Sequence, residues 1–140
     1  MKSAKWMLPV TLMLLSGLMA AQSLTHQSVV AQVPFDFMVS GKIIPAGECE
    51  VRATGMQGRI LVIRNFDARQ AALASSSPSQ DAVADSTVLV FTHYGDRYFL
   101  SSIRLEGSNQ TYNLPESRAE AELRAQNVTG SQTSLLASLQ

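Results

Sequence analysis

The chain has 140 residues with equal numbers of acidic and basic side chains. That length suits one modest domain, and the absence of a basic stripe that would neutralise phosphates argues against nucleic-acid binding. The only cysteine, Cys49, excludes an internal disulfide, so packing must stabilise the fold.

The first 21 residues have the layout of a secretory signal peptide. Lys2 and Lys5 give a positive start, residues 6–19 form an apolar run, and Ala20-Ala21-Gln22 supplies small residues for cleavage. We therefore expect residues 1–21 to be removed and the protein to be secreted or periplasmic. No cysteine follows the run, which excludes lipid attachment at a new N-terminal cysteine.

The apolar run is shorter than the hydrocarbon core of a membrane. As a helix it would measure about 21 Å, against ~30 Å for a hydrocarbon core, and Pro9 weakens it further. An uncleaved anchor is the alternative, since no charge lies between Lys5 and Asp36, and residues 29–31 are a second candidate cleavage site. Cleavage near Ala21 leaves nine basic and eleven acidic residues, a net charge near −2.

The first strand pattern runs from Val33 to Val39, where alternate apolar residues would share one buried face. Ser40-Gly41-Lys42 breaks it, and Pro45-Ala46-Gly47 predicts a turn. A second strand follows at 48–52, with its charged side facing water and Cys49 facing the core.

Later segments continue the strand pattern. Residues 59–65 form the next predicted strand, apolar on both faces from Ile60 to Ile63, as in a central strand, and 65–68 predict a hairpin turn. Residues 75–85 predict a mobile loop, long enough to bind a ligand but more typical of a solvated connection. The remaining predicted strands are 69–75, 86–94 and 97–105.

The pattern changes at Leu114, where Pro115 and the helix formers after it predict a helix over 114–127 that packs on the domain. We expect 128–140 to be a flexible tail, although its leucines could form a last packing segment. The domain boundaries are therefore 1–21 signal peptide, 22–113 β-domain, 114–127 helix and 128–140 tail.

Six to seven short strands with frequent turns predict a mostly β domain, an antiparallel β-sandwich or small barrel with one C-terminal α-helix. The blocks VPFDFMVSGKIIPAGECEVR, LVIRN, VFTHYGDRYFLSSI and LPESRAEAEL resemble, in this order, a family of small secreted proteins abundant in acidobacteria. The resemblance covers residues 33–124. It implies a secreted, mostly β domain with a C-terminal helix, and no activity. The chain departs from the family pattern at Cys49, where an aromatic residue is usual.

Motifs for catalysis, phosphate binding or metal binding are missing from the sequence. It lacks a Gly-x-Ser-x-Gly elbow, and it has no dinucleotide or phosphate loop. Its two histidines, His26 and His93, lie 67 positions apart. Tyr94, Tyr98 and Tyr112 could present ring faces to a sugar, but packing explains them equally well. We therefore assign no catalytic, cofactor or metal residue.

His93 and Asp96 are the closest approach to a catalytic pair. In one interpretation His93 is a general base oriented by Asp96, with Ser101 or Ser102 facing it across the hairpin. The interpretation we favour places Asp96 in a turn, paired with Arg97.

Three functions remain. The preferred hypothesis is an exported, non-enzymatic binding or structural module of the cell envelope. The alternatives are a small barrel that carries an apolar ligand, although about 100 structured residues are few for an eight-stranded carrier, and a small hydrolase that uses His93. The partner is unassigned, and a homodimer formed through exposed sheet edges stays open.

Overall fold

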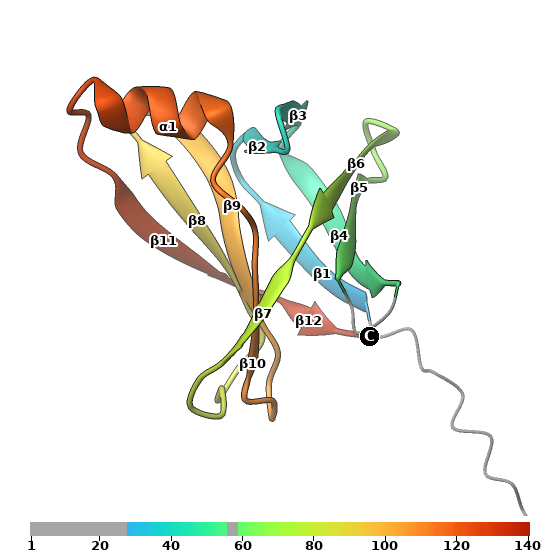
Figure 1. The fold of residues 1–140 in the computed structure, drawn as a ribbon. Helices are drawn as coiled ribbons and strands as arrows, with labels where there is room; N and C mark the ends of the chain where they lie inside the picture. The colour runs from blue at the N-terminus through green and yellow to red at the C-terminus, as the bar shows by residue number, and fades with distance from the viewer. Residues whose placement is uncertain (1–27, 56–58) are drawn as a thin grey trace, which may run out of the picture.

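A computed structural model describes residues 28–55 and 59–140. The predicted signal peptide and His26 lie outside these residues. The described part folds into two β-sheets that face each other as a sandwich, with one α-helix at one end (Figure 1). The prediction of a mostly β domain with a C-terminal helix is confirmed, and the sheets do not close into a barrel.

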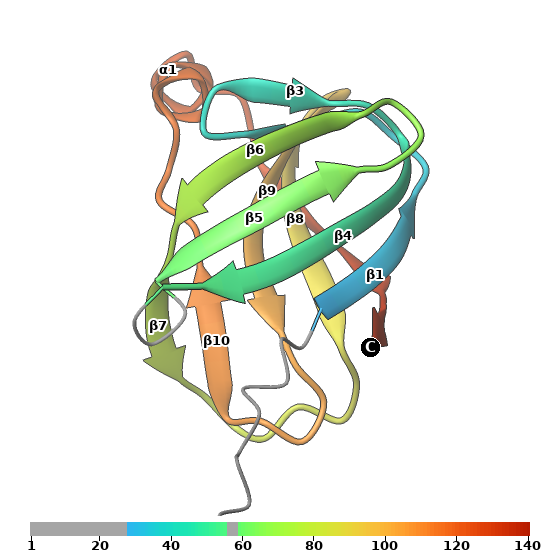
Figure 2. The same cartoon turned by 90° about the vertical axis from the view of Figure 1, so that its right-hand side faces the viewer.

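The five-stranded sheet is antiparallel throughout, in the order β12-β1-β4-β5-β6. Figure 2 looks onto its outer face. β5 lies between two strands, as its apolar sequence predicts. The strands are β1 Ser28–Val33, β4 Gly47–Thr54, β5 Ile60–Asn65, β6 Gln70–Ser75 and β12 Ser138–Leu139.

The seven-stranded sheet has the order β11-β8-β9-β10-β7, with the β2–β3 hairpin attached to β9. The β2–β9 pair is parallel and the other pairs are antiparallel. The strands are β2 Phe37–Val39, β3 Lys42–Ile44, β7 Ser77–Gln80, β8 Val88–Tyr94, β9 Arg97–Arg104, β10 Gln110–Asn113 and β11 Ser131–Leu136.

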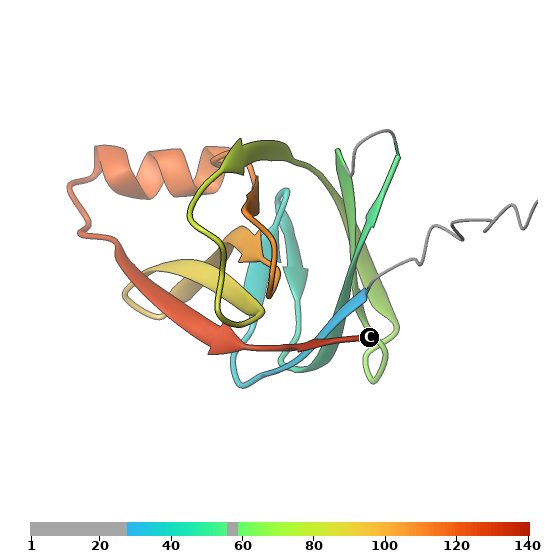
Figure 3. The same ribbon diagram turned by 90° about the horizontal axis from the view of Figure 1, so that it is seen from below.

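The chain crosses between the sheets at four places, one of them the turn at Pro45 and Ala46 between β3 and β4. β6 continues into β7 through Ser76, and β11 continues into β12 through Ala137 (Figure 3). The predicted strand 33–39 is likewise divided, because β1 ends at Val33 and β2 begins at Phe37 in the other sheet. Pro34 lies at this crossing and has no N–H for a sheet ladder. The predicted shared face holds, since Val33, Phe37 and Val39 are all buried.

Side chains from both sheets fill the space between them. Two phenylalanines anchor this core, each at most 2% exposed: Phe37 and Phe91. Phe91 makes edge-to-face contacts with two neighbours, at centroid distances of 5.0 Å from Phe35 and 5.2 Å from Phe37. Such edge-to-face pairs add to the stabilisation from apolar burial.

The predicted Pro45-Ala46-Gly47 turn is held from two sides. The Ala46 N–H donates to Oδ1 of Asp36 at 2.8 Å, and the buried Asn65 amide donates to the carbonyl oxygen of Pro45 at 2.7 Å. Gly47 has φ +140°, and a Cβ there would lie 3.3 Å from Nδ2 of Asn65. The turn is therefore part of the scaffold, because Asp36 and Asn65 are both used in the hydrogen bonds that hold it.

Two segments predicted as irregular form strands instead. The predicted loop 75–85 contains β7, which pairs with β10, and the predicted flexible tail 128–140 contains β11 and β12, which pair with β8 and β1. These polar sequences have little apolar alternation of their own. They form strands because the neighbouring strands offer backbone hydrogen-bond partners. The β-domain therefore extends to Leu139, and the strand count exceeds the six to seven expected.

The predicted helix 114–127 is shorter, since α1 spans Arg118–Ala125. Pro115 disfavours helical backbone at Leu114, whose N–H instead donates to the Ser101 carbonyl at 2.9 Å. Ser117 caps the helix by accepting the Glu120 N–H at 3.2 Å. None of the α1 residues is fully buried, so the helix rests on the end of the sandwich and contributes little to the core.

Candidate functional site

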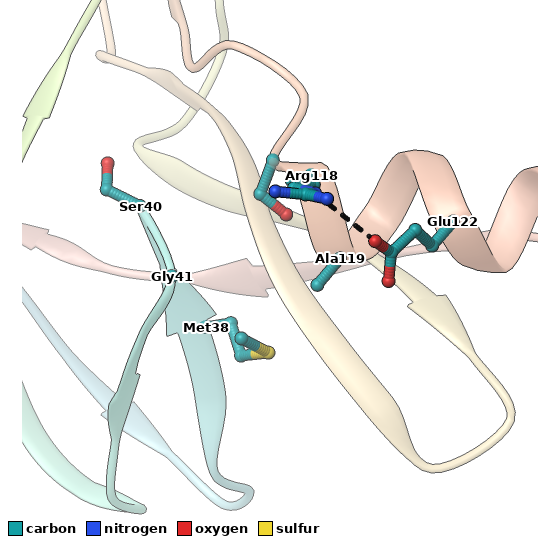
Figure 4. Close-up of a pocket in the computed structure, with 7 residues that line it drawn as sticks. Met38, Ser40, Gly41, Arg118, Ala119 and Glu122 are labelled. Carbon is teal, nitrogen blue, oxygen red and sulfur yellow. Dashed lines mark ion pairs between the residues drawn. The ribbon is translucent and has the colours of Figure 1, made fainter.

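A groove lies between the first turn of α1 and the β2–β3 hairpin, with a volume of about 430 Å³. We call it the helix–hairpin groove. Figure 4 shows its two walls, the hairpin on one side and the helix on the other. The lining residues are Met38, Ser40, Gly41, Ser117, Arg118, Ala119 and Glu122.

The hairpin wall is a tight two-residue turn. Val39 pairs with Lys42, and the two residues between them have positive φ, +50° at Ser40 and +80° at Gly41. Two successive positive φ values characterise the type I′ turn that suits the twist of a hairpin. Ser40 is strained in this conformation, because L-residues with a Cβ rarely adopt it. The turn thus presents the Ser40 hydroxyl beside the groove.

The helix wall is held in place by Glu120 and Tyr94. The Tyr94 hydroxyl donates to Oε1 of Glu120 at 3.2 Å, and Tyr94 itself is buried, with its ring 5.8 Å from that of Phe99. Burial raises the pKa of Glu120, although the hydrogen bond from Tyr94 opposes this effect. The contact fastens the exposed helix to the end of β8.

The groove has balanced charge and a partly apolar floor. Nε of Arg118 lies 3.3 Å from Oε1 of Glu122, one turn along the helix, and both side chains are largely exposed. Such a pair contributes little stability, because water screens its exposed charges. Met38 and Ala119 point toward each other across the gap (Figure 4). The groove therefore offers both charge signs, hydroxyl groups and a narrow apolar surface.

Two smaller cavities accompany the groove. One, of about 160 Å³, lies beyond Met38 and is lined by Asp36, Asp96 and Tyr98 among others. The other, of about 210 Å³, lies on the outer face of the five-stranded sheet.

One prediction about the 48–52 strand is wrong, as Glu50 in the lining of the second cavity shows. Glu50 was expected to face water, but it is only 7% exposed, and Oε1 lies 2.7 Å from Nη2 of Arg52. Its position on the outward side of β4 leaves it covered by neighbouring long side chains. This pairing uses both charges, so we do not assign a ligand to the cavity.

His93 is not arranged as a general base. Its Nδ1 lies 3.3 Å from the Gly95 carbonyl oxygen, and its ring stacks on Tyr98 at 5.0 Å. Among the described residues, no hydrogen bond or ion pair joins His93 to Asp96. The expected pairing of Asp96 with Arg97 is likewise missing from the described part of the chain.

The two serines considered with His93 lie elsewhere on the hairpin. His93 pairs with Tyr98 in the β8–β9 register, whereas Ser102 pairs with Val90. The Ser101 hydroxyl donates to the Val90 carbonyl at 2.9 Å, beside a bulge in the ladder. Neither serine is therefore placed across from the imidazole.

The tyrosines do not form an open sugar platform. Tyr98 is stacked on one side by Phe35 at 3.7 Å and also stacks with His93, so its ring lies within an aromatic column. Tyr94 is buried, and a Cβ at Gly130 would lie 2.8 Å from its ring. Tyr112 is half-buried against the core. These three rings serve packing.

Cys49 is completely buried, as predicted for an inward position on β4. Burial, with smaller effects from the negative charges of Asp67 and Glu48, raises the pKa of its thiol to about 11. The thiol is therefore protonated at neutral pH and is a poor nucleophile.

Within residues 28–55 and 59–140, no three His, Cys, Asp or Glu side chains lie close enough to hold a metal ion. The same residues include no helix with the length and hydropathy of a membrane span. Comparisons with protein-family models, curated proteins and solved structures found no match to this chain. The groove is thus interpreted from its geometry and chemistry.

Sequence reasoning missed the groove because its walls are almost 80 residues apart in the chain. Two local signals were present, the Ser40-Gly41 turn and the Ser117-x-x-Glu120 capping pattern. Each marks the end of an element, but neither indicates that the two ends meet.

Proposed function

We propose that the protein is an exported, non-enzymatic binding module of the cell envelope, and that its ligand contacts the helix–hairpin groove. The supporting observation is the groove itself, an open cavity of about 430 Å³ built from element ends on a sandwich with a filled interior. The signal-peptide pattern of residues 1–21 supports export.

The filled interior favours a binding module over a ligand carrier. A carrier must keep an apolar cavity inside the fold, as lipocalin-like barrels do. Here the space between the sheets holds Phe37, Phe91, Ile44, Leu61 and Ile63, all nearly inaccessible to solvent. The groove instead lies at one end of the sandwich, between α1 and the hairpin.

The surroundings of His93 favour a non-enzymatic role. A general base needs a free ring nitrogen within hydrogen-bond reach of a reacting group and a partner that orients the ring. His93 stacks on Tyr98 and faces the Gly95 carbonyl. If the protein is a binding module, replacing His93 by Ala leaves ligand affinity unchanged.

The chemistry of the groove selects the class of ligand. Arg118 and Glu122 neutralise each other, so a strongly anionic or cationic ligand gains little. Ser40, Ser117 and the apolar side chain of Met38 are among the residues that line the groove. This combination suits a neutral or zwitterionic envelope polymer that carries amide and hydroxyl groups.

Nuclear magnetic resonance of the chain without residues 1–21 tests the proposal, with peptidoglycan fragments from the host as the probe. We expect amide shifts to change at 38–41 and 117–122. Ala119→Gln should abolish these changes by filling the groove. Ala125→Gln, on the exposed last turn of the same helix, is the matched control and should bind normally. Gln is a good helix former without charge, so neither helix propensity nor the helix dipole changes much.

Two results would contradict the proposed site. Shift changes that cluster on the outer face of the five-stranded sheet would move the site away from the groove. Equal binding by Ala119→Gln and wild type would also show that the ligand does not contact the groove. Native mass spectrometry of protein exported by its own host tests the carrier alternative, because a carrier would show extra mass that leaves on denaturation.

A further inference from the structure

The free edges of the two sheets differ in how they are protected against strand pairing. An unpaired edge exposes backbone N–H and C=O groups to any other extended chain, and natural proteins blunt such edges with lysine, proline, short strands or a covering segment. The strands with a free side are β3, β6, β7, β11 and β12.

Four of these edges carry a recognisable protection. At β6, Nζ of Lys42 donates to the Ala71 carbonyl at 2.6 Å, and β3 lies beside the strand. β7 contains Pro78, which lacks an N–H. β3 has three residues including Lys42, and β12 has two residues.

β11 carries none of these protections. Its six residues, SQTSLL, include no charge and no proline, and every one of them pairs with β8 on one side. No strand pairs with its other side in the part of the chain that the structure describes. Figures 1 and 3 show that side open. Leu136, at its end, is 75% exposed, the highest value among the exposed large hydrophobic residues.

We propose that the free edge of β11 pairs antiparallel with β11 of a second copy of the chain, about a two-fold axis near Ser134. A two-fold axis near Ser134 places that residue opposite its own copy and pairs the other residues of the strand with one another. A strand of like charges would therefore repel itself, because like charges directly opposite are destabilising. β11 is neutral and avoids this cost. In this register Gln132 lies beside Leu136 of the second copy, which gives the exposed leucine a neighbour.

The dimer is weak and concentration-dependent. One strand pair of six residues buries much less than the ~1,200–2,000 Å² of a standard specific interface. We therefore expect a dissociation constant on the order of 100 μM. The seven-stranded sheets of the two copies then form one continuous sheet. The helix–hairpin groove shares no residue with β11, so this inference is independent of the proposed ligand.

Sedimentation velocity of the chain without residues 1–21, from ~5 μM to ~1 mM, tests the dimer. Ser134→Lys places two ammonium groups opposite each other and should weaken dimerisation at least ~10-fold. Ser77→Lys is the matched control, because Ser77 is exposed on β7 of the same sheet and accepts the hydrogen bond from the Asn113 amide through its backbone carbonyl, which the substitution keeps. It should dimerise like wild type.

A chain that stays monomeric at the highest concentration overturns the proposal. A dimer that Ser134→Lys leaves intact, or that both lysine variants weaken equally, also overturns it. Amide exchange of wild-type β11 provides a measurement without substitution. We expect slower exchange in β11 at high than at low concentration, and unchanged exchange there would contradict the proposed pairing.

Discussion

Replacing Asn65 by Ala tests how the turn at residues 45–47 is held. Asn65 is 1% exposed, and its amide nitrogen donates to the carbonyl oxygens of Pro45 at 2.7 Å and Ala46 at 3.2 Å. Its Oδ1 accepts the Ala68 N–H at 3.0 Å. One side chain therefore connects the β3–β4 turn with the β5–β6 turn.

The expected loss follows from these three hydrogen bonds. Each contributes a net ~1 kcal/mol on average, and a group left buried without a partner costs more. Ala46 and Ala68 are exposed, so water can replace part of the loss at those two residues. We expect Asn65→Ala to lower the free energy of unfolding by about 2–3 kcal/mol, which corresponds to a fall of ~10 °C in Tm for a domain of this size.

Urea unfolding followed by circular dichroism measures this loss, with Asn113→Ala as the matched control. Asn113 also donates two hydrogen bonds, to the Ser77 carbonyl at 3.1 Å and the Ser79 hydroxyl at 2.8 Å, but in a solvent-exposed position. Water can replace both, so we expect a loss below ~1 kcal/mol. If Asn65→Ala costs no more than Asn113→Ala, the reasoning that burial makes these bonds important is wrong.

Three further outcomes are expected. Iodoacetamide should modify Cys49 only after unfolding. The pKa of the Cys49 thiol is raised to about 11 in the folded protein, so the protonated thiol stabilises the fold by up to about 3 kcal/mol below pH 9. Urea unfolding should show that this stabilisation is lost as pH rises from 9 to 11. Tyr94→Phe should cost about 1 kcal/mol at pH 7. The loss should shrink as pH falls, because the half-buried Glu120 carboxylate loses its donor and its already raised pKa rises further, so that folding favours its protonated form. Mass spectrometry of the exported protein should place cleavage before Ser28, since cleavage after Ala31 would remove four of the six β1 residues that pair with β4.

The parts of the fold that the sequence predicts are those with strong apolar alternation. β8 and β9 carry Phe91 and Leu100 into the core, and their pattern gives both the strands and the Gly95 turn. β7 and β11 are polar, and they become strands because β10 and β8 provide backbone partners. That information lies in the tertiary structure, so local patterning assigned these segments to a loop and a tail.

The candidate site was less predictable than the fold for a related reason. The sequence drew attention to His93 because histidine can act as a base, but the structure uses the ring in a stack with Tyr98. Ser40 and Ala119 belong to residue types that do not by themselves indicate a functional site. Their position across a groove depends on where α1 rests after the chain leaves β10.

The two walls of the groove differ in how firmly they are held. The hairpin wall is anchored by Val39 and Ile44, which are at most 1% exposed and belong to the core. The helix wall has no fully buried residue and depends on its cap and on the hydrogen bond from Tyr94 to Glu120. Elements with few buried contacts open at low free-energy cost. The helix wall is therefore the side of the groove that can adjust to a ligand, while the hairpin fixes the position of the site on the sandwich.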